Sequence, residues 1–234
     1  MATGFNKIDM AKTYEPANTL YSRTFIALLV AQFLAAFNDQ AIHASAMFFA
    51  MPTALFPFWA DQAGAPWALG LFYAAGTIGS ILVTLTSGWV KSYTKHGRAI
   101  FWAALGWGLA ITLAGLVDNL FLILLFLILA GASDMVSALF RSTLWNQSIP
   151  DEFRGRLAGV ELISYSVGPL GGQTRAGFTA ERTSLRTSVV SGGLLCIAFV
   201  GFFAALLPDF RKYDSQTNEF AVSEAKKRKT APNN

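Results

Sequence analysis

The chain is poor in charged residues and has almost no cysteine or histidine. Asp, Glu, Lys and Arg make up 14% of its 234 residues, whereas a soluble domain carries roughly 25%. The single cysteine, Cys196, stands in an apolar run, which excludes an intrachain disulfide and a cysteine-based metal site. With two histidines, no phosphate-binding glycine loop and no metal-ligand spacing, the sequence predicts neither an enzyme nor a metal or cofactor.

Hydrophobic residues, by contrast, are abundant. They make up 53% of the chain, and the mean hydropathy is +0.44. The charges gather at the two ends and in short clusters between apolar runs, as in a chain whose spans lie in hydrocarbon and whose loops meet water. We therefore expect an all-α integral membrane protein in contact with the lipid bilayer. The net charge of +4 then belongs to loops and tails and does not indicate nucleic-acid binding.

Six apolar runs are long enough to cross a bilayer, which takes about 20 helical residues. They lie near residues 24–59, 66–91, 98–117, 119–147, 156–180 and 186–207. None alternates with the period of a barrel strand, so we expect helices. Pro52 and Pro57 should kink the outer end of the first run. The predicted organisation is a cytoplasmic segment (1–22), a six-helix membrane domain (23–210) and a disordered basic cytoplasmic tail (211–234).

The distribution of Lys and Arg predicts the orientation. These residues cluster before the first run, after the second, after the fourth and after the last, whereas the opposite loops hold Asp61, Asp118, Arg182 and Arg186. Because positive loops stay in the cytoplasm, both termini are expected there. The basic cluster at residues 226–229 either leans on anionic lipid or belongs to a solvated stop-transfer tail.

The stretch LAGASDMVSALFRST, residues 129–143, places an acid and a base within the fourth run. Asp134 and Arg141 lie two helical turns apart and so point to nearly the same face. At 1.5 Å per residue they lie about 22 Å and roughly 33 Å from the outer end. An acid facing lipid costs ~2.5–3.5 kcal/mol, so this face should turn into the bundle or a water-filled cavity. Alternatively, Asp134 is merely structural and Arg141 is a boundary anchor that reaches water.

The longer stretch LAGASDMVSALFRSTLWNQSIPDEFRGRLAGVE, residues 129–161, resembles the major facilitator superfamily. The likeness is closest to its enterobactin-exporter-like branch, where an Asp and an Arg on a helix precede a Pro-Asp-Glu loop. The fragments MFFAMPTALFP, HGRA, VVSGGLLC and LPDFRKYD extend the likeness over about residues 46–214. The resemblance implies the second, C-terminal six-helix half of that fold.

Two features depart from this pattern. AQFLAAFNDQAI, residues 31–42, resembles instead the opening helix of lysophospholipid-transporter-like members. The loop GWVKSYTKHGRA keeps Gly88, Gly97 and Arg98 but lacks the acid of the family's usual gating salt bridge.

The resemblance also implies charge networks at the cytoplasmic edge that hold one conformation and release it as two halves rock. A charge pair that forms in one state only biases the equilibrium towards that state. The residues that fall near this edge are the gate candidates, Arg98, Asp134, Arg141, Asp151, Glu152, Arg154 and Arg156.

Polar residues inside the first and fifth runs are candidates for a substrate or proton pathway. Asp39 and His43 share one helix face, and histidine titrates near neutral pH, which suits a proton relay; interhelical hydrogen bonding is the alternative. In the fifth run, SVGPLGG should unwind or kink the helix, and unwinding would free carbonyl groups towards a cavity. The candidates are Asn38, Asp39, His43, Glu161, Gln173 and Arg175. The small residues of AAGTIGS and the glycines at 106, 108 and 115 are expected at helix contacts.

Two classes of function remain open. The first is a half-size transporter of the bacterial inner membrane that exports a siderophore-like or hydrophobic organic molecule by proton exchange. It would act as a homodimer, because two copies with both termini inside can reproduce the parallel halves of a facilitator. The second is a non-transporting subunit, derived from a transporter half, that docks on another integral membrane protein. A truncated gene product is a third possibility.

Overall fold

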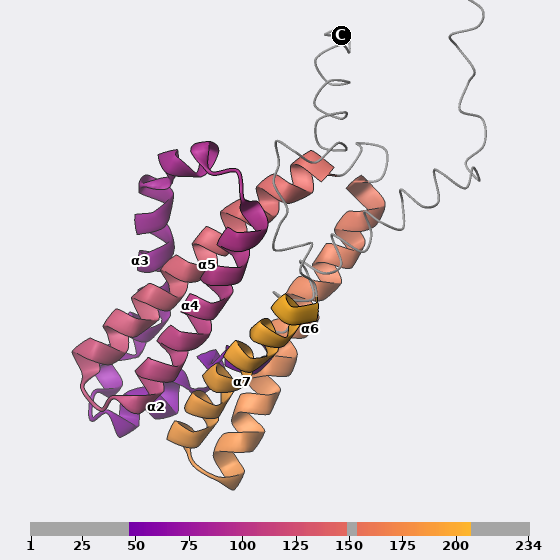
Figure 1. Cartoon of the computed structure of the whole chain (residues 1–234). Helices are drawn as coiled ribbons and strands as arrows, with labels where there is room; N and C mark the ends of the chain where they lie inside the picture. The colour runs from indigo at the N-terminus through magenta and orange to yellow at the C-terminus, as the bar shows by residue number, and fades with distance from the viewer. Residues whose placement is uncertain (1–46, 149–153, 207–234) are drawn as a thin grey trace, which may run out of the picture.

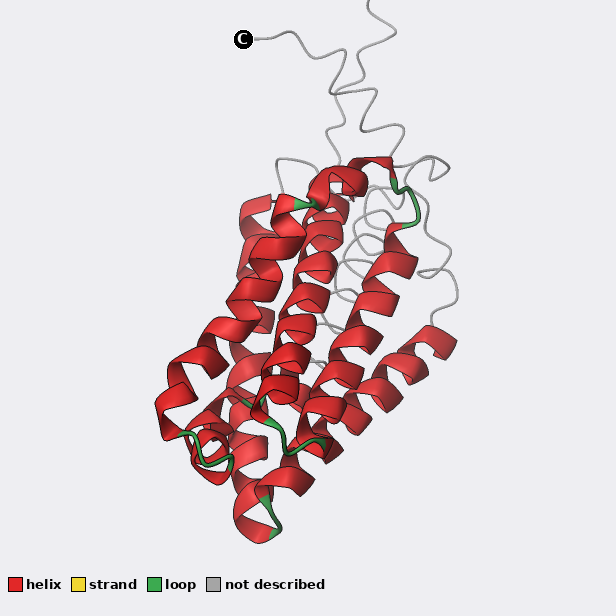
Figure 2. Cartoon of the chain, turned by 90° about the vertical axis from the view of Figure 1, so that its left-hand side faces the viewer, coloured by secondary structure: helices red, strands yellow, loops and turns green. Residues whose placement is uncertain are grey.

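The computed structural model describes residues 47–148 and 154–206. The sequence-based assignments for Asn38, Asp39, His43, Asp151 and Glu152, and for the two terminal segments, lie outside these residues. Within the described ranges, all regular structure is helical (Figure 2). The elements are η1 (Thr53–Leu55), α2 (Phe56–Gln62), η2 (Pro66–Ala68), α3 (Leu69–Leu85), η3 (Ser87–Ser92), α4 (His96–Leu116), α5 (Leu120–Ser148), α6 (Arg154–Arg182) and α7 (Leu185–Leu206).

Four stretches in the described part of the chain are long and apolar enough to cross a membrane. They are Pro66–Leu85, His96–Leu116, Leu120–Thr143 and Leu185–Phe203. These stretches match the second, third, fourth and sixth predicted spans, which are thereby confirmed as apolar helices of spanning length. The fifth span corresponds to α6, a helix of 29 residues that is not among the four, and most of the first run lies outside the described residues.

The long helices pack side by side in the order α3, α5, α4, α7, α6 (Figure 1). The α4–α5 and α6–α7 connections lie together at one end, which we call the Arg186 end. The α3–α4 connection lies at the opposite end, which we call the Phe140 end. Successive helices therefore alternate in direction, as consecutive membrane spans must.

Glycines bring α3 and α5 into backbone contact. A Cβ atom added at Gly79 would collide with the carbonyl of Ile128, and one added at Gly131 would collide with the backbone of Gly76. With no hydrophobic drive between helices in lipid, small residues permit the close packing that joins them. The expectation that the 74–80 stretch serves helix packing is confirmed.

Helix α4 uses glycines on two sides. A Cβ at Gly106 would come within 3.1 Å of Ser133 Oγ on α5, and one at Gly108 within 2.9 Å of Ile197 Cγ1 on α7. Gly115 is equally close to α7. The predicted packing role of these three glycines is therefore confirmed as well.

The prolines act according to their position. Residues 47–50 are helical but Met51 and Pro52 are not, so the first run breaks near Pro52, where the sequence predicts a kink. Pro57 lies in the first turn of α2. The N–H groups of a first turn make no hydrogen bond within the helix, so the N–H that proline lacks is not needed there. Of the two effects predicted for the fifth run, unwinding is wrong, because α6 continues unbroken through Pro169; a kink stays a prediction.

Candidate substrate cavity and its charge pair

A cavity of about 340 Å³ opens between the 47–56 segment, α3, α4 and α5. This volume is in the range of sites that hold small organic molecules. Its walls are largely apolar and include four aromatic side chains. The lining residues on which the argument depends are Met47, Met51, Thr53, Phe56, Phe72, Tyr73, Ser80, Trp107 and Asp134.

Asp134 is the one residue with a formal charge among the described residues that line this cavity. Its carboxylate oxygen lies 3.7 Å from Arg141 Nη2, and the side chains of Asp134 and Arg141 are 37% and 3% exposed. The predicted shared face of the two residues is therefore confirmed. The acid is reachable from the cavity, whereas Arg141 is enclosed and does not extend into water as a boundary anchor would.

Hydroxyl groups add polar character to the wall. Thr53 Oγ1 is buried and has no hydrogen-bond partner among the described residues. Tyr73 donates a hydrogen bond to the Thr53 carbonyl at 3.3 Å, while Ser80 donates to the carbonyls of Gly76 and Gly131. Within the described part of the chain, the Thr53 hydroxyl is therefore an unsatisfied polar group enclosed in the cavity wall.

The connection between α3 and α4 is held by aromatic packing at the Phe140 end. Phe140 is fully buried beside Arg141 in the sequence. Its ring centroid lies 5.6 Å from that of Trp89 and 5.5 Å from those of Tyr93 and His96. Such edge and tilted contacts contribute ~0.5–1.5 kcal/mol each beyond area burial. Arg98, a predicted gate residue, is exposed in the first turn of α4.

The remaining candidates all lie on α6. Arg154 and Arg156 are in its first turn, and Glu161 follows one to two turns later. Gln173 is half-buried near the other end, and Arg175 Nη2 donates a 2.6 Å hydrogen bond to the Phe49 carbonyl. Among the described candidates, the structure therefore joins Asp134 with Arg141 and gives Arg175 a backbone partner.

Sequence reasoning missed the aromatic wall and the polar network at the Arg186 end. Phe56, Phe72, Tyr73 and Trp107 lie in apolar runs and could not be distinguished from lipid-facing side chains by hydropathy. Phe56 alone had a signal, the density of aromatic residues around Pro52.

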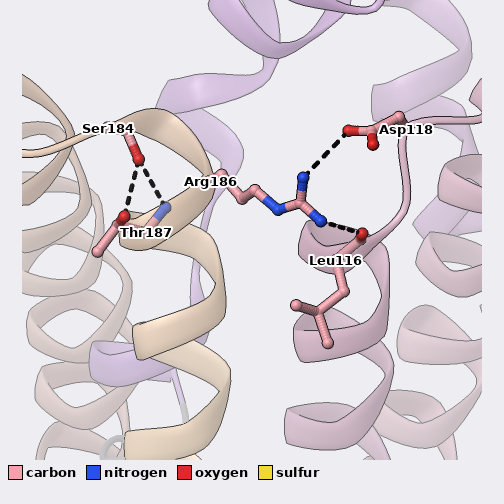
Figure 3. A network of polar contacts seen from close by, with 5 residues as sticks. All are labelled: Leu116, Asp118, Ser184, Arg186 and Thr187. Carbon is pink, nitrogen blue, oxygen red and sulfur yellow. Dashed lines mark hydrogen bonds and ion pairs between the residues drawn. The ribbon is translucent and has the colours of Figure 1, made fainter.

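The polar network joins the start of α7 to the α4–α5 connection (Figure 3). Arg186 lies 3.5 Å from Asp118 Oδ1 and donates to the carbonyl of Leu116, the last residue of α4. Ser184 accepts a hydrogen bond from the Thr187 N–H at 3.0 Å and so caps α7. Arg186 also borders a second cavity, of about 270 Å³.

Apolar helices of spanning length that surround a cavity with one acidic group among its described lining residues define a multi-span helical membrane protein. In sequence, the chain is similar to "Multidrug efflux pump Tap" of Mycolicibacterium fortuitum, with 27% identity over 172 residues, 73% of this chain and 42% of that protein. It is also similar to "Enterobactin exporter EntS" of Escherichia coli O1:K1 / APEC, with 28% identity over 159 residues, 67% of this chain and 38% of that protein.

These similarities relate the chain to membrane efflux transporters. The chain spans about two fifths of the length of the curated relatives it matches, 42% and 38%. No family model matches it, and no solved structure does.

Proposed function

We propose that this chain is a half-size transporter of the bacterial inner membrane that exports an organic molecule from the cavity at Asp134. The observation that carries the proposal is one reachable carboxylate in the aromatic wall of a cavity between apolar helices. A carboxylate within membrane helices costs free energy, and such residues almost always pair with another group or mark a substrate or ion pathway. The similarity to efflux transporters supports export as the activity.

Asp134 would couple export to protons by competition. A proton and a cationic group of the substrate cannot both occupy one carboxylate, so binding of one favours release of the other. Arg141 is the third competitor, since it already lies 3.7 Å from Asp134. A conformational change that favours the ion pair would therefore expel the substrate, which is the gate function expected of these two residues.

The lining favours a hydrophobic organic substrate over a siderophore-like one. A carboxylate repels the anionic oxygens of siderophores, whereas aromatic faces attract organic cations. Phe56, Tyr73 and Trp107 supply such faces. The proposed substrate is a singly cationic aromatic molecule.

A second copy of the chain would supply the other half of such a transporter. The two halves of a facilitator are parallel repeats related by an axis along the membrane normal. A homodimer with both termini in the cytoplasm would repeat that arrangement. The second candidate is a non-transporting subunit that docks on another integral membrane protein.

The test is transport in proteoliposomes that hold the purified full chain and a pH gradient, with ethidium as the cationic probe. We expect gradient-dependent movement, and a rate roughly tenfold lower in Asp134→Asn, which corresponds to ~1.4 kcal/mol in the barrier. Asp118→Asn is the matched control, because this acid is exposed and lies outside the Asp134 cavity.

Native mass spectrometry in mild detergent tests the partner. A mass of two copies supports the homodimer, whereas a stable complex with unrelated subunits and no ethidium movement supports the docking subunit. Full transport by Asp134→Asn would contradict the role given to this residue.

A further inference from the structure

We propose that Arg175 is a positioning residue, whose guanidinium caps the helix that ends at Ala50 and so fixes the cavity wall formed by residues 47–53. Sequence reasoning placed Arg175 in the substrate or proton pathway. Arg175 is absent from the described lining of the cavity. It therefore acts through the backbone that it binds, not by touching the substrate.

The helix end needs an external donor. The last four carbonyls of a helix have no partner within it, and residues 47–50 are followed by Met51 and Pro52, which are not helical. Pro52 has no N–H to offer. Ala50 is buried and Phe49 is half-buried, so a donor from the protein itself is needed here.

Arg175 supplies that donor from α6. Its Nη2 atom donates a 2.6 Å hydrogen bond to the carbonyl of Phe49, a residue 126 positions earlier in the chain. A cation is favourable at this end of a helix, because the carbonyl dipoles make it negative. The bond therefore combines a direct donor with an electrostatic match.

Two glycines make room for this contact. A Cβ atom at Gly192 of α7 would collide with the Phe49 carbonyl and meet Arg175 Nη2, and one at Gly172 of α6 would collide with the Met47 carbonyl. We call Gly172, Arg175 and Gly192 the helix socket. The socket gives a reason for the Gly-Gly pair in SVGPLGG: Gly172 admits a neighbouring backbone and Gly171 admits the Phe48 ring, while α6 stays helical.

The other side of the same segment is cavity wall. Met47, Met51 and Thr53 line the cavity, and Thr53 carries the hydroxyl that has no partner among the described residues. If the helix end shifts in its socket, these side chains shift with it. The effect of such a shift on export rests on the proposed function. The effect of the shift on the cavity wall does not.

The first test measures the wall without transport. The full chain is solubilised in detergent and treated with maleimide, which labels a cysteine introduced by Met51→Cys or by Thr77→Cys. Position 77 lies on the α3 wall of the cavity. The native chain, whose Cys196 is fully buried, gives the background labelling. Arg175→Met and Gly192→Ala should each raise labelling at position 51 roughly tenfold, a factor that corresponds to ~1.4 kcal/mol. Labelling at position 77 should not change.

Matched controls lie on the same two helices. Arg182→Met removes an exposed α6 arginine that stacks on Phe178, and Gly201→Ala adds a Cβ to α7 where nothing lies within 4 Å. Neither control should alter labelling at position 51. Arg175→Lys keeps a charged donor, so labelling at position 51 should rise much less in this variant than in Arg175→Met. Unchanged labelling at position 51 in both socket variants, or an equal rise at positions 51 and 77, would overturn the proposal.

The second test separates positioning from proton transfer. In the ethidium assay, Arg175→Met should raise the apparent KM severalfold and leave the pH profile of the maximal rate unchanged. A shifted pH profile would place Arg175 in the proton pathway and overturn the positioning role. If no variant of the chain transports ethidium, the proposed function fails, and the labelling experiment still decides whether the socket holds the wall.

Discussion

The charge pair in the fourth predicted span is unequal in its surroundings. Arg141 is 3% exposed, whereas Asp134 is 37% exposed and faces the cavity. Removal of either partner therefore has a different consequence. An acid that loses its ion-pair partner can still meet cavity water, whereas a guanidinium that loses its partner carboxylate stays enclosed. Breaking a buried ion pair from the exposed side therefore costs more.

This asymmetry predicts the outcome of a double-mutant cycle. Asp134→Asn should lower the free energy of unfolding more than Arg141→Met does, and the pair should show a coupling energy of ~0.5–3 kcal/mol. Thermal unfolding in detergent measures both. The exposed pair Asp118–Arg186 is the control, with an expected coupling of ~0–1 kcal/mol. Strict additivity of Asp134→Asn and Arg141→Met would show that the two side chains do not interact.

A second prediction at the residue scale concerns Phe140. This ring is 0% exposed and contacts three rings of the α3–α4 connection and the start of α4. Phe140→Ala should destabilise the protein by ~3–5 kcal/mol, because it opens a cavity at the centre of that cluster.

Phe121, on the same helix but 78% exposed, is the control for thermal unfolding of Phe140→Ala. Its change to alanine should have little effect in detergent. Equal losses for the two variants would mean that the aromatic cluster does not hold the loop.

At the scale of the elements, the bundle depends on glycine positions where helix backbones meet. Gly79→Ala should destabilise by ~1–3 kcal/mol or more through overpacking, since the new Cβ would collide with the backbone of α5. On the same helix, Gly70 has nothing within 4 Å of such a Cβ, so Gly70→Ala should be neutral or slightly stabilising. Melting temperatures of the two variants in one detergent test this contrast, and a stable Gly79→Ala would contradict the contact.

The prolines show how far local sequence decides an element. Pro52 and Pro57 were given one joint effect, a kink, yet Pro52 marks a break and Pro57 starts a helix. Pro169 is accommodated inside α6. A missing N–H is a local property, but whether it ends a helix depends on which neighbouring groups satisfy the freed carbonyls.

At the scale of the whole molecule, the predicted orientation can be tested directly. The α3–α4 connection and α2 lie towards opposite ends of the bundle (Figure 1), and Ser92 and Asp61 are exposed there. A membrane-impermeant maleimide applied to intact cells should label the cysteine of Asp61→Cys and spare that of Ser92→Cys. Permeabilised cells, in which both should react, are the control, and the reverse pattern would invert the topology.

The sequence alone determined the class of the protein and most of its spans. Hydropathy along each run is a local quantity, so α3, α4, α5 and α7 could be placed before their packing was known. The common face of Asp134 and Arg141 was also predictable, because seven residues make two turns of any α-helix.

Only the tertiary structure decided which side chains form the cavity and what Arg175 does. The wall joins Thr53 and Tyr73 to Trp107 and Asp134, which come from separate helices, and the Arg175–Phe49 bond spans 126 positions. No periodicity relates such residues. Their proximity follows from how closely the glycine faces allow the helices to approach, and that is a property of the packed bundle.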